Sequence, residues 1–303
     1  MNLLAPKYYL DFSCIADQCK HSCCIGWEID VDEKTMKKYS SLEGKYSENI
    51  RDSIEVDDVP HFKLTEKERC PHLNEKGLCN IILNRGEDCL CDICREHPRF
   101  YNFTNLGKEV GIGMSCETAC NLILKSDNFD EFVVLSEDNE PIEITEFDAT
   151  EERNKIYQIL RKDDLTLSEK IKIISDNYDI HIDDEEIRKN LENIEYLDIS
   201  HKELFAKFTT KNMDNKPIEN ELTRALAYFI YRHCSEACEY DEFILSLNFA
   251  IICTHLVSSL STKENIYDMA RIVSEEIEYS EDNIEAIKNS FILDDETYKE
   301  LFE

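Results

Sequence analysis

The chain has 303 residues, of which 42% are apolar and 33% are charged, so it is long and apolar enough to bury one large or two medium cores. Its formal net charge of −31 repels phosphate backbones and argues against nucleic acid as a main partner, whereas a cationic side chain would be attracted. The first residues lack the apolar segment and cleavage site of a secretory signal, so we expect a soluble, cytoplasmic protein with reduced thiols.

The first predicted feature along the chain is a cysteine-rich region. Eleven of the fourteen cysteines lie in clusters, at positions 14, 19, 23, 24, 70, 79, 89, 91, 94, 116 and 120. The adjacent pair Cys23 and Cys24 cannot form a mutual disulfide without a strained ring, and bunched thiolates can surround a soft cation or an iron-sulfur cluster. The spacing therefore predicts a metal or cluster site. A disulfide framework is the alternative, because the number of cysteines is even.

A strand and a helix are predicted after the first cysteine cluster. Trp27, Ile29 and Val31 alternate with acidic residues, which indicates a short strand that leads away from Cys24. Asp32 is then placed to cap a helix over 33–39.

A hairpin and a further helix are predicted before residue 125. Residues 100–104 and 109–112 form its strands, joined through Asn105-Leu106-Gly107. Ser115 is then expected to cap a helix over 116–125.

The remaining chain has a different composition. All seven glycines precede residue 114, and apolar residues from Leu222 to His233 recur at helical spacing, followed by an apolar stretch over 243–260. Polar residues interrupt that stretch, so no membrane span is expected. We predict a mostly α (α+β) protein with a loop-rich, cysteine-rich metal or iron-sulfur module at 1–128, a polar connector around Pro141, and a helical domain at 150–303.

The cysteine blocks resemble the bacterial flagellin lysine-N-methylase family. The matching segments are FSCIADQCKHSCCIGW at 12–27, CPHLNEKGLC at 70–79, CREHPR at 94–99, Ser115-Cys116 and, more distantly, YFIYRHC at 228–234. The first block is also similar to a broader group of small iron- or zinc-chelating proteins that share the Cys-Cys pair. Eight cysteines match family positions and are the expected metal ligands: Cys14, Cys19, Cys23, Cys24, Cys70, Cys79, Cys94 and Cys116. The other six are expected to be plain buried thiols.

The resemblance implies a protein-lysine methyltransferase. Such an enzyme transfers a methyl group from S-adenosylmethionine to lysines of flagellin, and a 4Fe-4S cluster is held by its cysteine-rich part. From the residues alone, four sulfurs suit tetrahedral zinc as well as a four-iron cluster. The chain has neither a glycine-rich strand-to-helix turn nor a C-x-x-x-C-x-x-C motif. An incompletely ligated iron is therefore the expected anchor for the amino-carboxylate of S-adenosylmethionine.

Few residues are needed for the chemistry itself. The attacking lysine must be neutral, so an aromatic pocket or a base is required, and Tyr101, Tyr228 and Tyr231 are candidates, with Tyr101 and Tyr231 preferred. Arg99 and Arg232 are candidates to bind the cofactor carboxylate. Core tyrosines and structural salt bridges are the alternatives for these residues.

Three histidines and two acidic runs are further candidates for binding a metal or a substrate. His21, His72 and His97 lie beside cysteine blocks and could complete a mixed-ligand site. The runs at 57–58 and 183–186 could attract a cationic lysine, although solvated helix starts explain them equally well.

Three functional classes follow from these features. The first is a cluster-dependent protein-lysine methylase, and the second is a non-enzymatic iron-sulfur or zinc scaffold. The third is a structural zinc module on an interaction domain.

Overall fold

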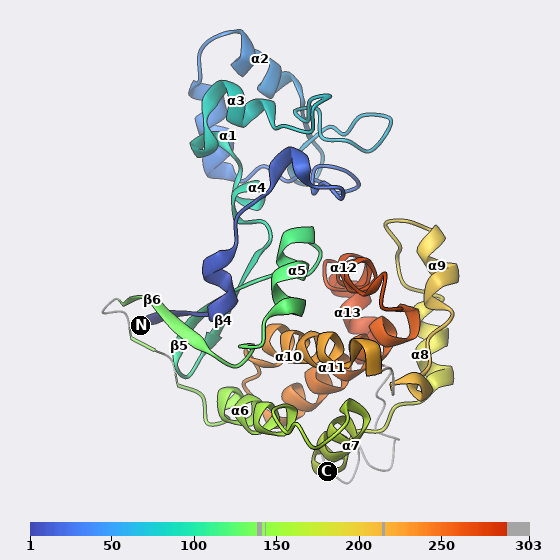
Figure 1. The fold of residues 1–303 in the computed structure, drawn as a ribbon. Coiled ribbons are helices and arrows are strands. Elements are labelled where there is room, and N and C mark those ends of the chain that lie inside the picture. The colour runs from blue at the N-terminus through green and yellow to red at the C-terminus, as the bar shows by residue number, and fades with distance from the viewer. Residues whose placement is uncertain (138–140, 143, 214–215, 290–303) are drawn as a thin grey trace. The chain divides into compact units, whose positions relative to one another are not determined.

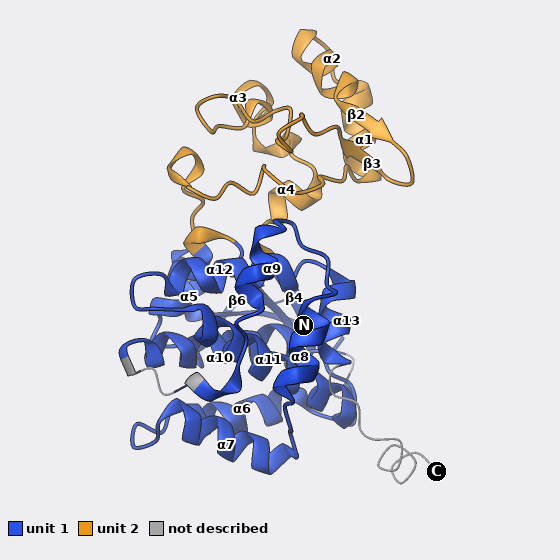
Figure 2. Ribbon diagram, turned by 90° about the vertical axis from the view of Figure 1, so that its right-hand side faces the viewer, with its two compact units in different colours: residues 1–12, 100–115, 119–303 blue, residues 13–99, 116–118 orange. Residues whose placement is uncertain are grey.

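The computed structural model describes residues 1–137, 141–142, 144–213 and 216–289. The chain forms two compact units (Figures 1 and 2). Unit 1 comprises Met1–Phe12, Phe100–Ser115 and Ala119–Glu303, and unit 2 comprises Ser13–Arg99 and Cys116–Thr118. The boundaries of these units differ from those of the expected domains at 1–128 and 150–303. The expected domains stay a prediction.

Unit 1 contains a four-stranded sheet in the order β4-β5-β1-β6. Its strands are β1 (Asn2–Pro6), β4 (Arg99–Thr104), β5 (Gly107–Ile112) and β6 (Phe132–Glu137). The hairpin of β4 and β5 is confirmed. The first strand β1 runs parallel to β5 and antiparallel to β6, and the register pairs Asn2 with Gly107. A β-carbon at Gly107 would meet the Asn2 carbonyl oxygen at 2.5 Å, so glycine permits this approach.

Two strands of this sheet were not predicted. The sequence indicated no strand at β1, and β6 ends at Glu137, shortly before the polar connector expected around Pro141. The β6 segment begins Phe132-Val133-Val134-Leu135, which is a short apolar run of the kind that pairs in sheets. Around Pro141, residues 138–140 and 143 lie outside the described residues, and the expected connector stays a prediction.

The other elements of unit 1 are helices, built around α10 and α11. Their bounds are α5 (Glu117–Lys125), α6 (Ala149–Leu160), α7 (Leu167–Tyr178), α8 (Asp184–Leu191), α9 (Ser200–Phe205), α10 (Glu219–Cys234), α11 (Tyr240–Leu260), α12 (Ile266–Ile277) and α13 (Glu281–Lys288). The long helices α10 and α11 pack side by side, and α6, α12 and α13 pack on them (Figure 1). Between residues 150 and 289 the described residues form no strand, so the mostly α (α+β) prediction is confirmed.

Helix α11 is a core helix. By length and composition it could cross a membrane, but 89% of its most apolar window is buried inside the protein. The buried side chains of this helix project from all of its sides, as in a helix that other helices enclose.

Unit 2 is smaller and has more loops. It contains α1 (Glu33–Ser41), α2 (Lys45–Asp52), α3 (Asn80–Arg85), α4 (Asp92–Glu96) and the hairpin of β2 (Ile54–Val56) and β3 (Pro60–Phe62). The predicted cap of α1 is confirmed, because the Asp32 carboxylate accepts a hydrogen bond of 2.8 Å from the Thr35 N–H.

Two local predictions are corrected. Residues 27–31 form no regular strand and have one isolated bridge, from Asp30 to His61, while a second bridge joins Ile25, before this segment, to Arg69. The alternation still decides burial, since Ile29 and Val31 are in the core. Helix α5 begins at Glu117, and the buried Ser115 hydroxyl has no hydrogen-bond partner, so it is not the cap that we expected.

A candidate thiolate centre

Cysteines form much of the hydrophobic core of unit 2. Cys70, Cys89 and Cys91 are buried in that core, and Cys24, Cys79 and Cys94 pack against it. The remaining members of this core are Ile29, Val31, Tyr39, Ile50, Phe62 and Ile81, with partly buried neighbours such as Met36 and Leu73. All fourteen cysteines of the chain are free thiols, so the alternative of a disulfide framework is wrong for this structure.

Backbone contacts bring the core thiols together from distant segments. The Cys70 N–H donates to the Cys24 carbonyl at 2.8 Å, which ties the first cysteine block to the second. A bridge between Leu73 and Cys79 closes the 70–79 loop. Cys91 is the N-cap residue of the short helix α4, and Cys94 lies within that helix.

The thiols of this core act on one another electrostatically. Burial, together with the neighbouring Cys24 and Cys79, raises the pKa of Cys70 to about 12. Hydrogen bonding with Cys91 is the main reason why the pKa of Cys94 is raised, and Cys24 and Cys70 also contribute. The pKa of Cys24 is lowered to about 7 because it accepts a hydrogen bond from Cys23.

A second group of thiols lies outside this core. Cys14 and Cys23 are exposed, whereas Cys19 and Cys116 are half-buried. The Glu117 carboxylate accepts hydrogen bonds from the Lys20 N–H at 2.8 Å and from the Cys19 thiol at 3.6 Å. This contact joins the 116–118 segment to the first cysteine block, and Cys116 and Cys14 both contribute to the raised pKa of Cys23.

The chemistry of these donors fits a soft ion or an iron-sulfur cluster, because sulfur dominates and histidine contributes little. Their positions form no finished site: in the described part of the chain, no three His, Cys, Asp or Glu side chains are arranged to hold a metal ion. Thiols that hydrogen-bond to each other, as Cys23 and Cys24 do, would have to lose protons and separate when an ion binds.

His72 is not placed as a ligand. Its ring is buried, and its two nitrogens hydrogen-bond to the Tyr46 hydroxyl at 3.0 Å and the Ser53 hydroxyl at 2.9 Å. Burial lowers the pKa of His72 to about 4, so the ring is neutral at pH 7. His21 is exposed and His97 is half-buried, and their expected part in a mixed-ligand site stays a prediction.

Five of the six other cysteines are buried, as expected of plain thiols. These are Cys89, Cys91, Cys120, Cys234 and Cys253, whereas Cys238 is exposed. Cys91 lies among the thiols of the unit 2 core.

The four candidate catalytic and cofactor-binding residues have different surroundings. Arg99 ends unit 2 and donates to the Arg95 carbonyl at 3.4 Å. Tyr101 lies in unit 1 on the exposed side of β4, with the Lys108 Nζ 4.0 Å from its ring centre. Their functional roles stay predictions.

Tyr231 is a core residue of unit 1. Its side chain is 1% exposed, its ring packs on Phe100 and Phe132, and its hydroxyl has no hydrogen-bond partner. A β-carbon at Gly111 would meet the Tyr231 ring at 2.7 Å, so glycine makes room for the packing. Burial raises the pKa of Tyr231 well above its usual value, so the phenol stays protonated at pH 7 and a phenolate base is absent.

Arg232 already has a partner inside unit 1. Its Nε lies 3.3 Å from Glu278, whose carboxylate also lies 2.7 Å from His233 Nε2. Arg232 also donates to the Tyr228 hydroxyl at 3.0 Å, and that hydroxyl donates to Glu278 at 3.1 Å. Burial opposes the charge of Glu278, but Arg232 and His233 outweigh it and lower the pKa of this carboxyl.

This network pairs the charged side chains at the end of helix α10. Arg232 and His233 occupy the last turn of α10, and a charge there must be paired when it is buried. Sequence reasoning missed Glu278. The helical spacing of apolar residues does not indicate which acidic residue of another segment contacts α10.

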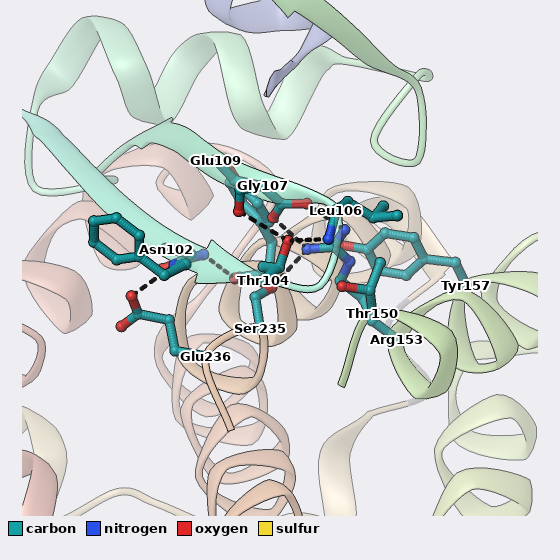
Figure 3. A network of polar contacts seen from close by, with 12 residues as sticks. Asn102, Thr104, Leu106, Gly107, Glu109, Thr150, Arg153, Tyr157, Ser235 and Glu236 are labelled. Atoms are coloured by element: carbon teal, nitrogen blue, oxygen red, sulfur yellow. Dashed lines mark hydrogen bonds and ion pairs between the residues drawn. The ribbon is translucent and has the colours of Figure 1, made fainter. Parts of the chain in front are cut away.

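A second buried ion pair joins β5 to helix α6 (Figure 3). Arg153 donates to both Glu109 oxygens, at 2.6 and 2.9 Å, and to the Ser235 hydroxyl at 2.6 Å, and both charged side chains are 1% exposed. Nearby, Asn102 donates to the Tyr231 carbonyl at 2.8 Å (Figure 3). These contacts hold the sheet against helices α6 and α10.

The acidic run at 183–186 has structural roles. The Asp183 carboxylate accepts from the N–H groups of Glu185 and Glu186 and so caps α8. Asp184 accepts hydrogen bonds from Thr209 and Thr210. The residues at 57–58 are exposed.

Three curated proteins of Salmonella have sequences similar to part of this chain. The flagellar biosynthetic protein FliU of Salmonella muenchen is 26% identical over 130 residues, which cover 39% of this chain and 75% of FliU. Lysine-N-methylases of Salmonella choleraesuis and Salmonella typhimurium are each 25% identical over 133 residues, which cover 39% of this chain but only 31% of those proteins. No family model and no solved structure matches the chain. Over little more than a third of its length, the chain is thus similar to flagellar biosynthetic and lysine-N-methylase proteins.

Proposed function

We propose that the protein is a protein-lysine N-methyltransferase that acts on flagellin, with S-adenosylmethionine as methyl donor and a 4Fe-4S cluster in unit 2. One observation carries the proposal: the cysteines that resemble the lysine-N-methylase blocks, although up to 102 residues apart in sequence, fold into one compact unit. The partial similarity to curated lysine-N-methylases supports the same activity.

The proposed reaction needs a neutral amine. The lone pair of the lysine Nε forms a bond to the sulfonium methyl carbon while the carbon–sulfur bond breaks, which gives methyl-lysine and S-adenosylhomocysteine. The amine must first lose a proton, since its ordinary pKa is about 10.4. A desolvated site or a carboxylate would accept that proton. Buried Tyr231 is a poor acceptor because its phenol is already protonated.

The proposed cluster would be held by Cys14, Cys19, Cys23, Cys24, Cys70, Cys79, Cys94 and Cys116, or by a subset of them, and zinc is the alternative ion. When bound, an iron with an open position would supply an anchor for the amino-carboxylate of the methyl donor. The candidate partners for that carboxylate are Arg99 and Arg232, and Arg232 would have to leave its pair with Glu278 to bind it.

Charge supports the choice of a cationic substrate. Unit 1 has 21 basic and 46 acidic side chains, whereas unit 2 has 13 and 19. The long-range field of so acidic a protein attracts lysine-rich surfaces at low ionic strength.

The test is mass spectrometry of flagellin from the same organism after anaerobic incubation with the metal-loaded protein and S-adenosylmethionine. We expect mass increases of whole methyl groups on lysines, and none with metal-free protein or without the methyl donor. Arg99→Ala should weaken binding of S-adenosylmethionine more than binding of metal, whereas Lys67→Ala, which removes an exposed charge of the same unit, should change neither.

The second candidate function is a non-enzymatic iron-sulfur or zinc scaffold. The observation that favours it is the coverage, since the match spans only 31% of the curated lysine-N-methylases. Flagellin that gains no mass on any lysine, although metal loading is complete, would select this candidate and reject methyl transfer.

A further inference from the structure

Strand β4 of unit 1 carries two exposed aromatic side chains on one face. Asn102 and Thr104 are buried, whereas Tyr101 is 36% exposed and Phe103 is 59% exposed. Successive side chains of a strand point to opposite faces of the sheet, so the two rings lie together on the face away from the buried pair. Adjoining exposed rings are typical of a surface that binds something.

A lysine ammonium lies close to both rings. The Nζ of Lys108, on the neighbouring strand β5, is 4.0 Å from the centre of the Tyr101 ring and 5.5 Å from that of the Phe103 ring. Both distances lie within the roughly 6 Å over which an ammonium is attracted to the face of an aromatic ring. Among the described residues, no carboxylate forms an ion pair with this ammonium. The two rings are therefore arranged to hold a cation.

The charges beside the rings also favour a cation. The Glu236 carboxylate accepts a hydrogen bond of 2.8 Å from the Phe103 N–H, which is drawn as a dashed line in Figure 3. Two residues further along, the Cys238 N–H donates to the Glu242 carboxylate at 2.9 Å. Two carboxylates thus lie near the exposed edge of β4 and attract positive charge to it.

Methylation changes a lysine in a way that suits two aromatic rings. A methylated lysine keeps its positive charge but has fewer N–H groups that need water, and aromatic rings recognise such groups well. Lys108 is tethered beside the rings, so its effective concentration there is high, on the order of millimolar or more. An unmodified lysine of another protein has no advantage over Lys108, whereas a methylated lysine does.

We propose that Tyr101 and Phe103 form a binding site for a methylated lysine side chain of a protein partner. Lys108 occupies this site when no partner is bound, and it excludes unmodified lysines. The inference rests on the proposed function, because methyl transfer would place methyl-lysine on the substrate and the site would then hold the product. A partly methylated substrate would stay bound while its other lysines react.

The first test compares three short peptides of glycine and serine that differ in one central residue. That residue is Nε-trimethyl-lysine, lysine or an uncharged carbon analogue of trimethyl-lysine, and the dissociation constants for the full chain are measured by NMR titration. We expect the trimethyl-lysine peptide to bind, and the other two to bind more weakly by on the order of tenfold. Equal affinities for the three peptides, or no binding of the trimethyl-lysine peptide, overturn the proposal.

The second test changes the site. Tyr101→Leu/Phe103→Leu keeps an apolar surface on β4 but removes both rings, so the preference for the charged trimethyl-lysine peptide over its uncharged analogue should disappear. Lys108→Ser removes the resident ammonium and should bind the trimethyl-lysine peptide several-fold more tightly. The control Tyr240→Ala, which removes an exposed ring at the start of α11, should bind as the unmodified protein does. A double variant that keeps the preference, or a Lys108→Ser variant with unchanged affinity, overturns the proposal.

These measurements contain neither S-adenosylmethionine nor flagellin, so they separate the site from the reaction. Binding of the trimethyl-lysine peptide by a protein that transfers no methyl group refutes the proposed function alone. Methyl transfer by a protein that does not distinguish the three peptides refutes the binding site alone.

Discussion

The two units are stabilised in different ways. Unit 1 buries long apolar helices, and in α11 sixteen side chains are buried on all sides of the helix. The core of unit 2 has nine buried residues, three of which are cysteines. Small domains rarely bury enough apolar area to be stable alone and use metals or disulfides instead. Since the thiols of unit 2 are free, we expect the stability of unit 2 to depend on a metal. We do not expect the stability of unit 1 to depend on one.

Removal of the metal should have the largest effect. The free energy of binding for structural zinc is about 10–16 kcal/mol in small zinc domains, so chelation should unfold unit 2 and leave unit 1 folded. Trp27 is the sole tryptophan and lies in unit 2, so its fluorescence reports on that unit alone, while far-UV circular dichroism is dominated by the helices of unit 1. A fluorescence spectrum that chelation leaves unchanged would contradict the expected metal dependence of unit 2.

Disruption of the buried ion pair should be the largest single-residue effect on unit 1. Arg153→Met leaves the Glu109 carboxylate buried without its partner, which costs about 3–5 kcal/mol. Urea unfolding followed by circular dichroism measures the loss, and the metal content and Trp27 fluorescence should stay unchanged. The matched control Arg161→Met breaks a solvent-exposed pair with Asp130 and should cost about 1 kcal/mol or less. Equal losses in the two variants would contradict the role of burial.

Acid should weaken unit 1 through His255. Burial lowers the pKa of His255 to about 4, and the nearby Asp184 only partly offsets this shift. Because the unfolded state, with an ordinary pKa near 6.5, binds the proton more readily, stability is fully present above about pH 6.5 and falls as the pH drops towards 4. The loss reaches on the order of 3 kcal/mol, since one pKa unit corresponds to about 1.36 kcal/mol.

The variant His255→Gln isolates this contribution. We expect the difference in unfolding free energy between pH 7.5 and pH 4.5 to be smaller in the variant than in the unmodified protein, whatever its stability at neutral pH. An unchanged pH dependence would show that another group, such as the buried carboxylate of Glu278, is responsible.

The smallest expected effect sharpens the comparison within unit 2. The Tyr39 hydroxyl donates to the Cys89 carbonyl at 2.7 Å in the core, and Tyr39→Phe removes this hydrogen bond. A loss of about 1 kcal/mol is expected in the unfolding of metal-loaded protein followed by Trp27 fluorescence. The exposed Tyr101→Phe in unit 1 serves as the control and should leave that transition in place.

The sequence by itself determined the features that depend on neighbouring residues. The cap at Asp32, the β4–β5 hairpin and helices α10 and α11 were all predicted, because capping and periodicity act within a few residues. The clusters of cysteines likewise predict a thiolate site, since the donors are identified by their chemistry alone, and this site stays a prediction. The alternation at 27–31 gave the correct buried side chains but the wrong element, because a strand also needs a continuous partner.

Only the tertiary structure decided the long-range pairings. The strand β1 enters the sheet between β5 and β6, more than a hundred residues away, and Glu278 meets Arg232 and His233 from a different helix. The different surroundings of Cys23 and Cys24 are a result of the same kind. They depend on which thiols other segments bring close to each of the two residues. Local patterns contain no information on which distant segment will pack against them, so sequence reasoning could name the charged and thiol groups but not their partners.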